Sequence, residues 1–544
     1  MPIQFGALTL DPSVISKQLR GDMKDDWFFD PLNYADMLHE ATLERIVQAN
    51  FEKNAGLYES YERHVFNLPK PNFTLRYALE TGLSDRFLYH GLVAHLVPFY
   101  DKLLGPSVYS HRYDYDKPDE RYLFKRGIPA WGDFIGSVRS ALEPGSFLVS
   151  TDLTNYYECV NLERLKAELL SLLPNVEAIA EQKYQIRQVL DDLFRCLANW
   201  TFDKERGLPQ NRDASSFLAN VYMHPVDQAM RRLGYEGHYF RYMDDVKIVC
   251  PDEFAARQAL KHLILELRKH GLAVNAKKTS LSPAADTKAI GDCLQQASQT
   301  VTHLDSIWRT NNPALILGKA QALRLYTLEL LDARNFDSRE FRFCIKRLYN
   351  LRMCSSFSVP DQFFEEITPR VIEGLTRSPA STDQISKYLR AAPLTSAHLQ
   401  SVADFLLDKA RSIYGWQNYQ LWSLLTAKQY IDERLFEAAK KSIGGADDPS
   451  RAGATLYAGA LGDNAAREYI ARNFRTLNSF LGQRIAIIAV HELDFRPIIF
   501  DFVVPHLRPD LLGVYRQLKG HKGDYVNPLD PVFLGEDTFE EHES

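Results

Sequence analysis

The sequence predicts an α+β fold for the first half of the chain and an all-helical fold for the second half. Residues up to about 290 contain short runs of β-branched and aromatic residues, such as 147–153 and 238–250, that are typical of strands. Between them, residues 162–173 carry leucines at helical spacing behind Asn161, the expected N-cap. After about residue 300 the strand pattern fades and amphipathic patterns follow one another. Strands and helices mixed in this way favour an α/β or α+β domain.

Longer helical patterns organise both halves. Residues 215–234 are expected to form a helix that is bent or interrupted at Pro225, because proline removes a backbone donor. In the second half, loosely similar helix pairs recur about 40 residues apart. That recurrence suits an all-α, HEAT-like helical-repeat domain, and a compact helical bundle is the alternative.

Length and composition limit the class of protein. A chain of 544 residues exceeds one hydrophobic core, and 45% hydrophobic with 25% charged residues is ordinary globular composition. The net charge of -6 excludes a generic polyanion binder, so any nucleic-acid contact must come from a local basic surface. We expect a mixed domain over 1–295, a helical domain over 296–522 and an acidic, mobile tail over 523–544.

The sequence indicates a soluble protein of a reducing compartment. Its six cysteines are scattered without Cys-x-x-Cys spacing, which disfavours a zinc site or a disulfide framework. The first residues lack the basic-then-apolar order of a signal peptide. The most apolar late stretch, 485–504, is broken by charged residues, whereas a bilayer span needs about 20 nearly uncharged residues. We therefore expect a cytoplasmic protein without a membrane partner.

Two adjacent carboxylates form the most informative motif. Tyr242, Met243, Asp244 and Asp245 lie between apolar residues of strand type, so the aspartates are expected at the tip of a β-hairpin. Carboxylates held side by side repel each other unless a cation is present. Oxygen ligands of this kind suit Mg²⁺, which uses one or two carboxylates with substrate phosphates and water. The alternative is a solvated surface turn.

A third carboxylate ends an earlier strand. Asp152 stands where the apolar run that begins at residue 147 changes into a turn. Alone, it is typical of a helix cap or a turn. If the strand end and the hairpin tip converge on one edge of a sheet, three carboxylates can hold two Mg²⁺ ions, one activating a 3′-hydroxyl and one binding a triphosphate.

A glycine-containing turn lies between these motifs. Gly207, Leu208, Pro209 and Gln210 precede Asn211 and the expected helix. Such a turn lets the backbone and a side-chain amide approach a planar ligand closely. The alternative is an ordinary loop and helix start.

Taken in order, four motifs resemble the palm motifs of reverse transcriptases. The first contains Asp152 and Tyr157, the second runs from Gly207 to Asn220, and the third is Tyr242 to Asp245. The fourth consists of His270, Gly271 and Leu272, followed by Asn275, Lys278 and Thr279. The resemblance implies a right-hand fingers–palm polymerase domain with nucleotidyltransferase activity.

The resemblance also implies roles for single residues. Asp152 and Asp244 match the principal metal ligands and Asp245 a supporting carboxylate, for two Mg²⁺ ions that Mn²⁺ can replace. Tyr157 matches the aromatic gate whose ring crowds a ribose 2′-hydroxyl and thereby selects deoxynucleotides. Gln210 matches the residue that contacts the incoming nucleotide or its template partner.

Further residues are assigned to the nucleotide and its leaving group. Tyr242 and Met243, of the third motif, are expected beside the nucleotide. Lys278 would lie near the leaving pyrophosphate, where an ammonium can stabilise charge or donate a proton. A solvated surface lysine is the alternative for Lys278.

The region before the palm motifs resembles the fingers. Arg76 is the expected triphosphate contact, because a guanidinium grips phosphate oxygens bidentately, and an exposed or salt-bridged arginine is the alternative. Arg86 and Arg112 are further basic residues of this region. One position departs from the family: many members have glycine after the glutamine of the second motif, where this chain has Asn211. A side chain there would reshape the template-side pocket.

A fingers–palm domain followed by about 240 helical residues is similar to the abortive-infection and other defence-associated reverse transcriptases of bacteria. That resemblance implies antiphage activity, homo-oligomers, dNTP substrates and, in some members, untemplated DNA synthesis primed by a protein hydroxyl, with the DNA product covalently attached. An associated RNA is a further expected partner. The alternatives are a conventional RNA-templated enzyme of a retron or intron type, and a palm-fold binding module that acts through its helical domain.

Overall fold

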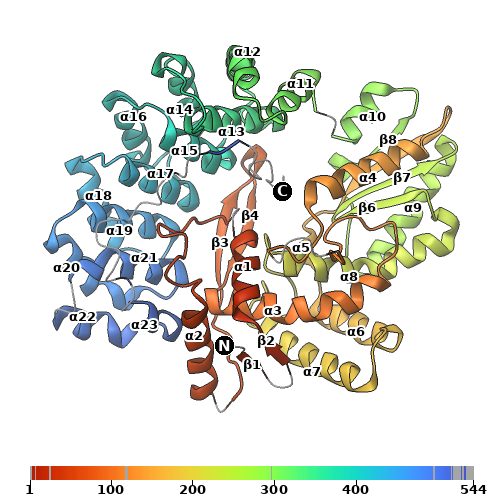
Figure 1. The fold of residues 1–544 in the computed structure, drawn as a ribbon, viewed down its shortest axis with the longest axis horizontal. Coiled ribbons are helices and arrows are strands. Elements are labelled where there is room, and N and C mark those ends of the chain that lie inside the picture. Colours follow the sequence, from red (N-terminus) through yellow and green to blue (C-terminus); the bar gives the residue numbers. More distant parts are fainter. Residues whose placement is uncertain are drawn as a thin grey trace.

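Two unlike parts lie on either side of a central β-hairpin in the computed structural model (Figure 1). The structure describes residues 3–5, 8–23, 26–54, 56–116, 121–295, 297–493, 497–515, 518, 529 and 532–534. A part that contains a sheet lies to the right of the hairpin, and an array of helices curves around its left and upper sides. The predicted α+β fold class is confirmed.

A four-stranded antiparallel sheet forms the centre of the first part. Its strands are β5 (Phe147–Asp152), β6 (Tyr239–Tyr242), β7 (Asp245–Cys250) and β8 (Ser280–Pro283), in the order β6-β7-β5-β8. Successive strand residues point to opposite faces, so Leu148 packs with Phe134 while Val149 joins the main core. The helix α4 (Gly127–Ala141) covers the first face, and α9 (Glu253–Lys269) covers the second.

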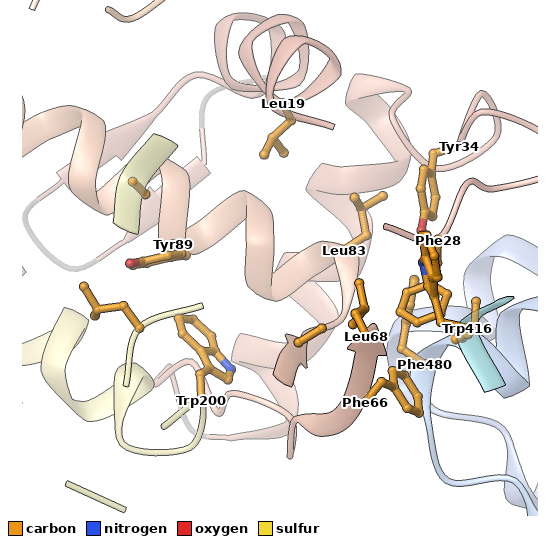
Figure 2. Packing of buried hydrophobic residues seen from close by; sticks show 14 of the residues in the cluster. Leu19, Phe28, Tyr34, Phe66, Leu68, Leu83, Tyr89, Trp200, Trp416 and Phe480 are labelled. Carbon is orange, nitrogen blue, oxygen red and sulfur yellow. The ribbon is translucent and has the colours of Figure 1, made fainter. Parts of the chain in front are cut away.

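The fingers region consists of the central hairpin and the helices beside it. β3 (His64–Pro69) and β4 (Leu75–Glu80) pair antiparallel through the 3₁₀ turn η1 (Pro71–Phe73). α3 (Leu83–Tyr100) packs against α1 (Pro12–Asp22), α7 (Ala180–Leu197) and α8 (Asp213–Met230). Its Tyr89 meets Trp200 edge to face, with ring centroids 5.5 Å apart (Figure 2). The other helices and strands of the first part, outside the sheet and the fingers elements named above, are β1 (Ile3–Phe5), β2 (Leu8–Leu10), α2 (Glu40–Lys53), α5 (Tyr156–Cys159), α6 (Leu162–Leu172) and α10 (Thr287–Cys293).

The palm elements follow the sequence pattern closely. The predicted strands are β5 and the β6–β7 hairpin, and the aspartate pair lies at the hairpin turn as expected. α6 begins after Asn161, whose side chain accepts a hydrogen bond from the Arg164 N–H, which confirms the predicted N-cap. The predicted interruption at Pro225 is wrong, because α8 continues through this residue. Packing of α8 against α3, α6 and α9 outweighs the one backbone hydrogen bond that proline removes.

The second half is a curved array of helices in two layers. The inner layer is α13 (Arg339–Met353), α15 (Thr382–Ala391), α17 (Gly415–Ala427), α19 (Pro449–Leu461) and α21 (Phe480–Val490). The outer layer is α12 (Pro313–Asp332), α14 (Ile367–Arg377), α16 (Ser396–Leu407), α18 (Glu433–Ile443) and α20 (Asn464–Arg472). α11 (Gln299–Trp308) begins the array, and α22 (Pro497–Phe502) and α23 (Pro509–Tyr515) end it. Each inner helix packs on an outer helix and on the next inner one, which favours a stacked array over a compact bundle.

An amino-terminal segment joins the two parts. The Trp416 indole of α17 donates to the carbonyl of Trp27 at 2.7 Å. Phe28 packs edge-on against Phe66 of β3, with ring centroids 5.3 Å apart, and lies beside Phe480 and Trp416 in Figure 2. The predicted boundary between residues 295 and 296 falls between α10 and α11, but the segment before α2 already belongs to the core that both parts share.

Most of the predicted tail, 523–544, lies outside the described residues. Within it, Val532 forms a parallel bridge with Cys354 and packs against Tyr349 and Ala391. Among the described residues, no helix combines the length and the apolar character that crossing a bilayer requires.

Candidate active site

Two carboxylates meet at the edge of the palm sheet. β5 and β7 pair in a register that sets Asp152 opposite Asp245, and the Leu153 N–H donates to the Asp244 carbonyl at 3.2 Å. Met243 adopts a left-handed φ of 54°, which closes a tight turn between β6 and β7. This turn brings the Asp244 carboxyl into hydrogen-bond contact with the carboxyl of Asp152.

The electrostatics of this pair favour a bound cation. Burial, followed by the neighbouring Asp152 carboxylate, raises the pKa of Asp244 well above its ordinary value. A site that disfavours two negative charges this strongly is stabilised when a divalent cation neutralises them. Two carboxylates facing substrate phosphates form the kind of oxygen-donor set that Mg²⁺ uses in phosphoryl-transfer sites, so the residues present fit this metal.

Asp245 departs from the expected triad. Its carboxylate binds Lys247 Nζ at 2.5 Å, and Lys247 also donates to Ser150 Oγ at 2.8 Å. Burial raises the pKa of Asp245, and the Lys247 ammonium opposes this shift. Its Oδ2 atom is buried and has no hydrogen-bond partner among the described residues. Among the described residues, no three His, Cys, Asp or Glu side chains are grouped to hold a metal ion. Asp245 pairs opposite Asp152 in the sheet and its charge acts on Asp244, but its carboxylate is bound by Lys247.

A buried arginine fixes the turn. Arg241 binds Asp227 through both carboxylate oxygens, at 2.9 and 2.7 Å, and donates to the Met243 carbonyl at 3.1 Å. The Met243 N–H donates to Ser110 Oγ at 3.0 Å. The turn that carries Asp244 is therefore held from both sides by groups outside the palm motifs.

Three basic side chains surround the carboxylate pair. Lys278 donates to Asp152 at 2.5 Å. Although burial works in the opposite direction, this hydrogen bond and the Asp152 charge raise the pKa of Lys278. Arg76 reaches in from β4, where burial lowers its pKa and the facing Asp244 carboxylate opposes the shift. Both predicted cations thus lie beside the site.

Lys70 is a third cation, which sequence reasoning missed. It follows β3 at the tip of the central hairpin, and the charges that act on it come from Arg76, Glu158, Lys278 and Asp152. Burial, followed by repulsion from Arg76, lowers its pKa. A lysine at the tip of a hairpin and six residues before Arg76 is the signal that could have identified it.

The predicted gate lies across from these cations. Asn155 takes a left-handed φ of 48° before the short helix α5, which turns Tyr157 toward α8. The Tyr157 hydroxyl shares a hydrogen bond of 2.8 Å with Ser216 Oγ. The charges of Asp244 and Arg76 act on the same hydroxyl. The ring is therefore fixed next to the carboxylate pair.

Gln210 is buried in a small polar network beside the gate. Its side chain lies near Glu158 and near Tyr77, whose buried hydroxyl has no hydrogen-bond partner among the described residues. Gly207 has a φ of 103°, a conformation that needs glycine. Asn211 has a φ of 58°, so the position where the family often has glycine is a left-handed one, and asparagine is the residue that tolerates it next best.

Four predicted residues have other partners. The Tyr242 hydroxyl donates to the Gly127 carbonyl at 3.4 Å and its ring packs on α4, while Met243 is buried in the main core. Both therefore shape the turn rather than face the carboxylate pair. Arg86 binds Asp26 at 2.6 Å and Arg112 binds Asp101 at 2.7 Å, so these two arginines have structural roles.

Comparison with known proteins agrees with this geometry. Residues 137–304 match the family model described as reverse transcriptase (RNA-dependent DNA polymerase). The matched span holds the carboxylate pair, Tyr157, Gln210 and Lys278, and it excludes Arg76 and Lys70 of the hairpin. This part of the chain is therefore similar to the reverse-transcriptase family.

Solved structures with a similar chain path include two yeast telomerases. The telomerase of Candida albicans, in complex with a fragment of telomeric RNA, is 13% identical with a TM-score of 0.31, covering 70% of this chain and 69% of that one. The apo telomerase of Candida tropicalis is 12% identical with a TM-score of 0.32, covering 72% and 70%. These values are too low to support an assignment of function. No curated protein matches the chain.

Proposed function

We propose that this chain is a DNA polymerase of the reverse-transcriptase type that adds deoxynucleotides by two-metal phosphoryl transfer. The observation that carries the proposal is the contact between the Asp152 and Asp244 carboxyls, opposite the cations of the hairpin. Two negative groups for metal ions beside positive groups for a triphosphate form the arrangement that this reaction requires.

Each side chain has a distinct task in the proposed reaction. When bound, two Mg²⁺ ions would activate a 3′-hydroxyl and neutralise triphosphate charge, with Asp152 and Asp244 as their ligands. Arg76 and Lys70 bind the phosphate oxygens from the hairpin side. Lys278 stabilises the leaving pyrophosphate or donates a proton to it. The Tyr157 ring occupies the space that a ribose 2′-hydroxyl would need.

Incorporation of labelled dNTPs tests the activity. Purified protein is incubated with each dNTP and Mg²⁺, with and without template and primer. Asp244→Asn is expected to lower the rate by at least roughly 100-fold, the scale for removing one group that stabilises transition-state charge. The matched control is Asp191→Asn, which removes a carboxylate of the exposed pair with Lys166. Equal rates for Asp244→Asn and the starting protein would refute the proposal.

Two features support an untemplated, protein-primed mode. Asn211 stands where many reverse transcriptases have glycine, so a side chain is present there, and the helical array after the palm is similar to the architecture of the defence-associated enzymes. In this mode a hydroxyl of the protein itself receives the first nucleotide. Label that stays with denatured protein in the absence of template would support it. Elongation only with an RNA template and primer would support the conventional retron or intron type.

The same architecture supports a role in antiphage defence by homo-oligomers. A bacterium that expresses the chain is expected to restrict phage growth, and Asp244→Asn is expected to abolish this effect. Restriction that persists in Asp244→Asn would favour the alternative, a palm-fold module that acts by binding a partner through its helical array. Sequencing of any RNA that co-purifies with the protein tests the expected RNA partner.

A further inference from the structure

An exposed aromatic ring is held in place beside the nucleotide turn. Phe202 lies in the loop between α7 and Gln210 and stacks on Tyr77 of β4, with ring centroids 4.4 Å apart and an interplanar angle of 22°. Tyr77 is 7% exposed, whereas Phe202 is 47% exposed. One face of the Phe202 ring is therefore covered by Tyr77, and much of the residue faces solvent.

The local sequence is built to permit this stack. A Cβ at Gly207 would lie 2.9 Å from the Tyr77 hydroxyl and 3.2 Å from the Phe202 Cβ, so only glycine leaves room for the pair. The Phe202 N–H donates to the Arg206 carbonyl at 2.8 Å, and Arg63 donates to the Phe202 carbonyl at 3.2 Å. Hydrogen bonds at both the N–H and the carbonyl of Phe202 therefore fix its backbone.

The stack is connected to the nucleotide site. The side chain of Gln210 lies near the Tyr77 hydroxyl, which has no hydrogen-bond partner among the described residues, so the Phe202–Tyr77 stack adjoins this buried amide. Neighbouring residues of a strand point to opposite faces, and Arg76, next to Tyr77, faces Asp244. The two faces of β4 thus serve different groups: one faces the phosphate side of the site, and the other carries the aromatic pair.

Exposed apolar side chains continue from the stack toward the tip of the hairpin. Leu75 lies two residues before Tyr77 on the same face of β4 and is 53% exposed. Phe73, at the end of η1, is 60% exposed. Large apolar side chains that remain in solvent next to a binding site usually mark a contact surface.

We propose that Phe202 is a stacking platform for an unpaired base of single-stranded nucleic acid that enters the nucleotide site, and that Leu75 and Phe73 continue its track. The inference rests on the proposed function and names the partner of the same site. A nucleobase suits this surface because a planar ring extends an existing two-ring stack. Stacking also tolerates any base, since every base has a π-face.

Binding of a strand with and without bases tests the platform. Fluorescence anisotropy measures the affinity of the full chain for a labelled 20-residue dT oligonucleotide and for an abasic strand of the same length. Phe202→Ala is expected to weaken dT binding roughly tenfold or more and to leave abasic binding unchanged, because only stacking is lost. Phe202→Trp is expected to keep the affinity, and Phe202→Leu to lose it. The matched control is Phe254→Ala, because Phe254 on α9 is 78% exposed and its loss is expected to change nothing.

Several outcomes would overturn the inference. Equal losses for the dT and abasic strands would mean that Phe202 supports the loop and not a base. Unchanged strand affinity would also overturn it, and an accompanying loss of self-association in sedimentation would assign the ring to a second copy of the chain. An oligo(U) RNA of the same length distinguishes RNA from DNA as the source of the base.

The inference and the proposed function can fail separately. The assay is repeated in Asp244→Asn, where no nucleotide is added. In this variant, base-dependent binding is expected to persist. Base-dependent binding that requires Phe202, in a starting protein that adds no nucleotide in the incorporation assay, would support the platform and refute the polymerase. Polymerase activity together with strand binding that does not depend on the bases would support the polymerase and refute the platform.

Discussion

Replacing Arg241 would show how the palm holds the turn that carries Asp244. Arg241 is fully buried, and its guanidinium binds both carboxylate oxygens of Asp227 at 2.9 and 2.7 Å. It also donates to Asn220 Oδ1 at 2.8 Å and to the Met243 carbonyl at 3.1 Å. Arg241→Met removes these bonds, frees the turn before Asp244 and leaves the Asp227 carboxylate buried without its cation.

The expected cost follows from the charge that remains. Removing one partner of a buried ion pair typically costs about 3–5 kcal/mol, because the other charge stays buried. Arg241→Met and Asp227→Asn are each expected to lower the free energy of unfolding by an amount on this scale. The double variant buries no unpaired charge, so its cost is expected to be smaller than the sum by roughly 2–3 kcal/mol.

Urea unfolding of the starting protein, the two single variants and the double variant measures this coupling. Incorporation of labelled dNTP shows whether the turn still supports the proposed activity. Both single variants are expected to lose activity along with stability. The control is Arg434→Met, since Arg434 is half exposed in its pairs with Asp404 and Asp432, and its loss is expected to leave the free energy of unfolding nearly unchanged. Single-variant costs that add within about 0.5 kcal/mol, or an Arg241→Met protein with unchanged stability, would refute the reasoning.

Three further predictions concern the gate, a buried acid and the joint between the two parts. Tyr157→Ala is expected to raise rNTP use relative to dNTP use roughly tenfold or more in single-turnover assays, while Tyr157→Phe keeps the discrimination. Burial, followed by Asp510, raises the pKa of Asp85 to about 8, so the folded chain keeps a proton that the unfolded chain releases. The free energy of unfolding should therefore fall from about pH 4 to about pH 8, and urea titrations of Asp85→Asn at several pH values should show a weaker dependence on pH. Arg484→Met is expected to lower the thermal midpoint, because Asp30 and Asp36 then stay buried without their cation.

The carboxylates of the palm were predictable because local patterns determine their places. Asp152 ends an apolar strand, and Asp244 lies between two strands that can only pair as a hairpin. Once both strands belong to one antiparallel sheet, the two residues must reach the same edge. The stacking of helix pairs in the second half also follows from amphipathic spacing, since each pair needs a neighbour to cover its apolar face.

The rest depends on contacts between residues that are distant in sequence. Asp245 follows Asp244 in the motif, but it lies on the same face of β7 as Lys247, two residues further on, and its carboxylate binds that ammonium. Tyr242 alternates to the opposite face of the sheet and packs on Trp131. Lys70 and the ring of Phe202 lie outside the four motifs, so only the path of the fingers hairpin and of the loop after α7 brings them to the site.

The two halves of the proposed site are held by different parts of the molecule. The carboxylate pair belongs to the palm sheet, whereas Arg76 comes from a hairpin whose strand β3 packs on α17 and whose turn η1 touches η7 (Pro379–Ser381), just before α15. The amino-terminal segment binds the same array through Trp416 and through Arg484, which is 1% exposed between two aspartates. The helical array therefore supports the hairpin that carries Arg76 and Lys70, whereas Lys278 stands with the carboxylates in the palm. If the proposed function holds, a change in the position of the array is expected to move Arg76 and Lys70 while leaving Asp152 and Asp244 in place.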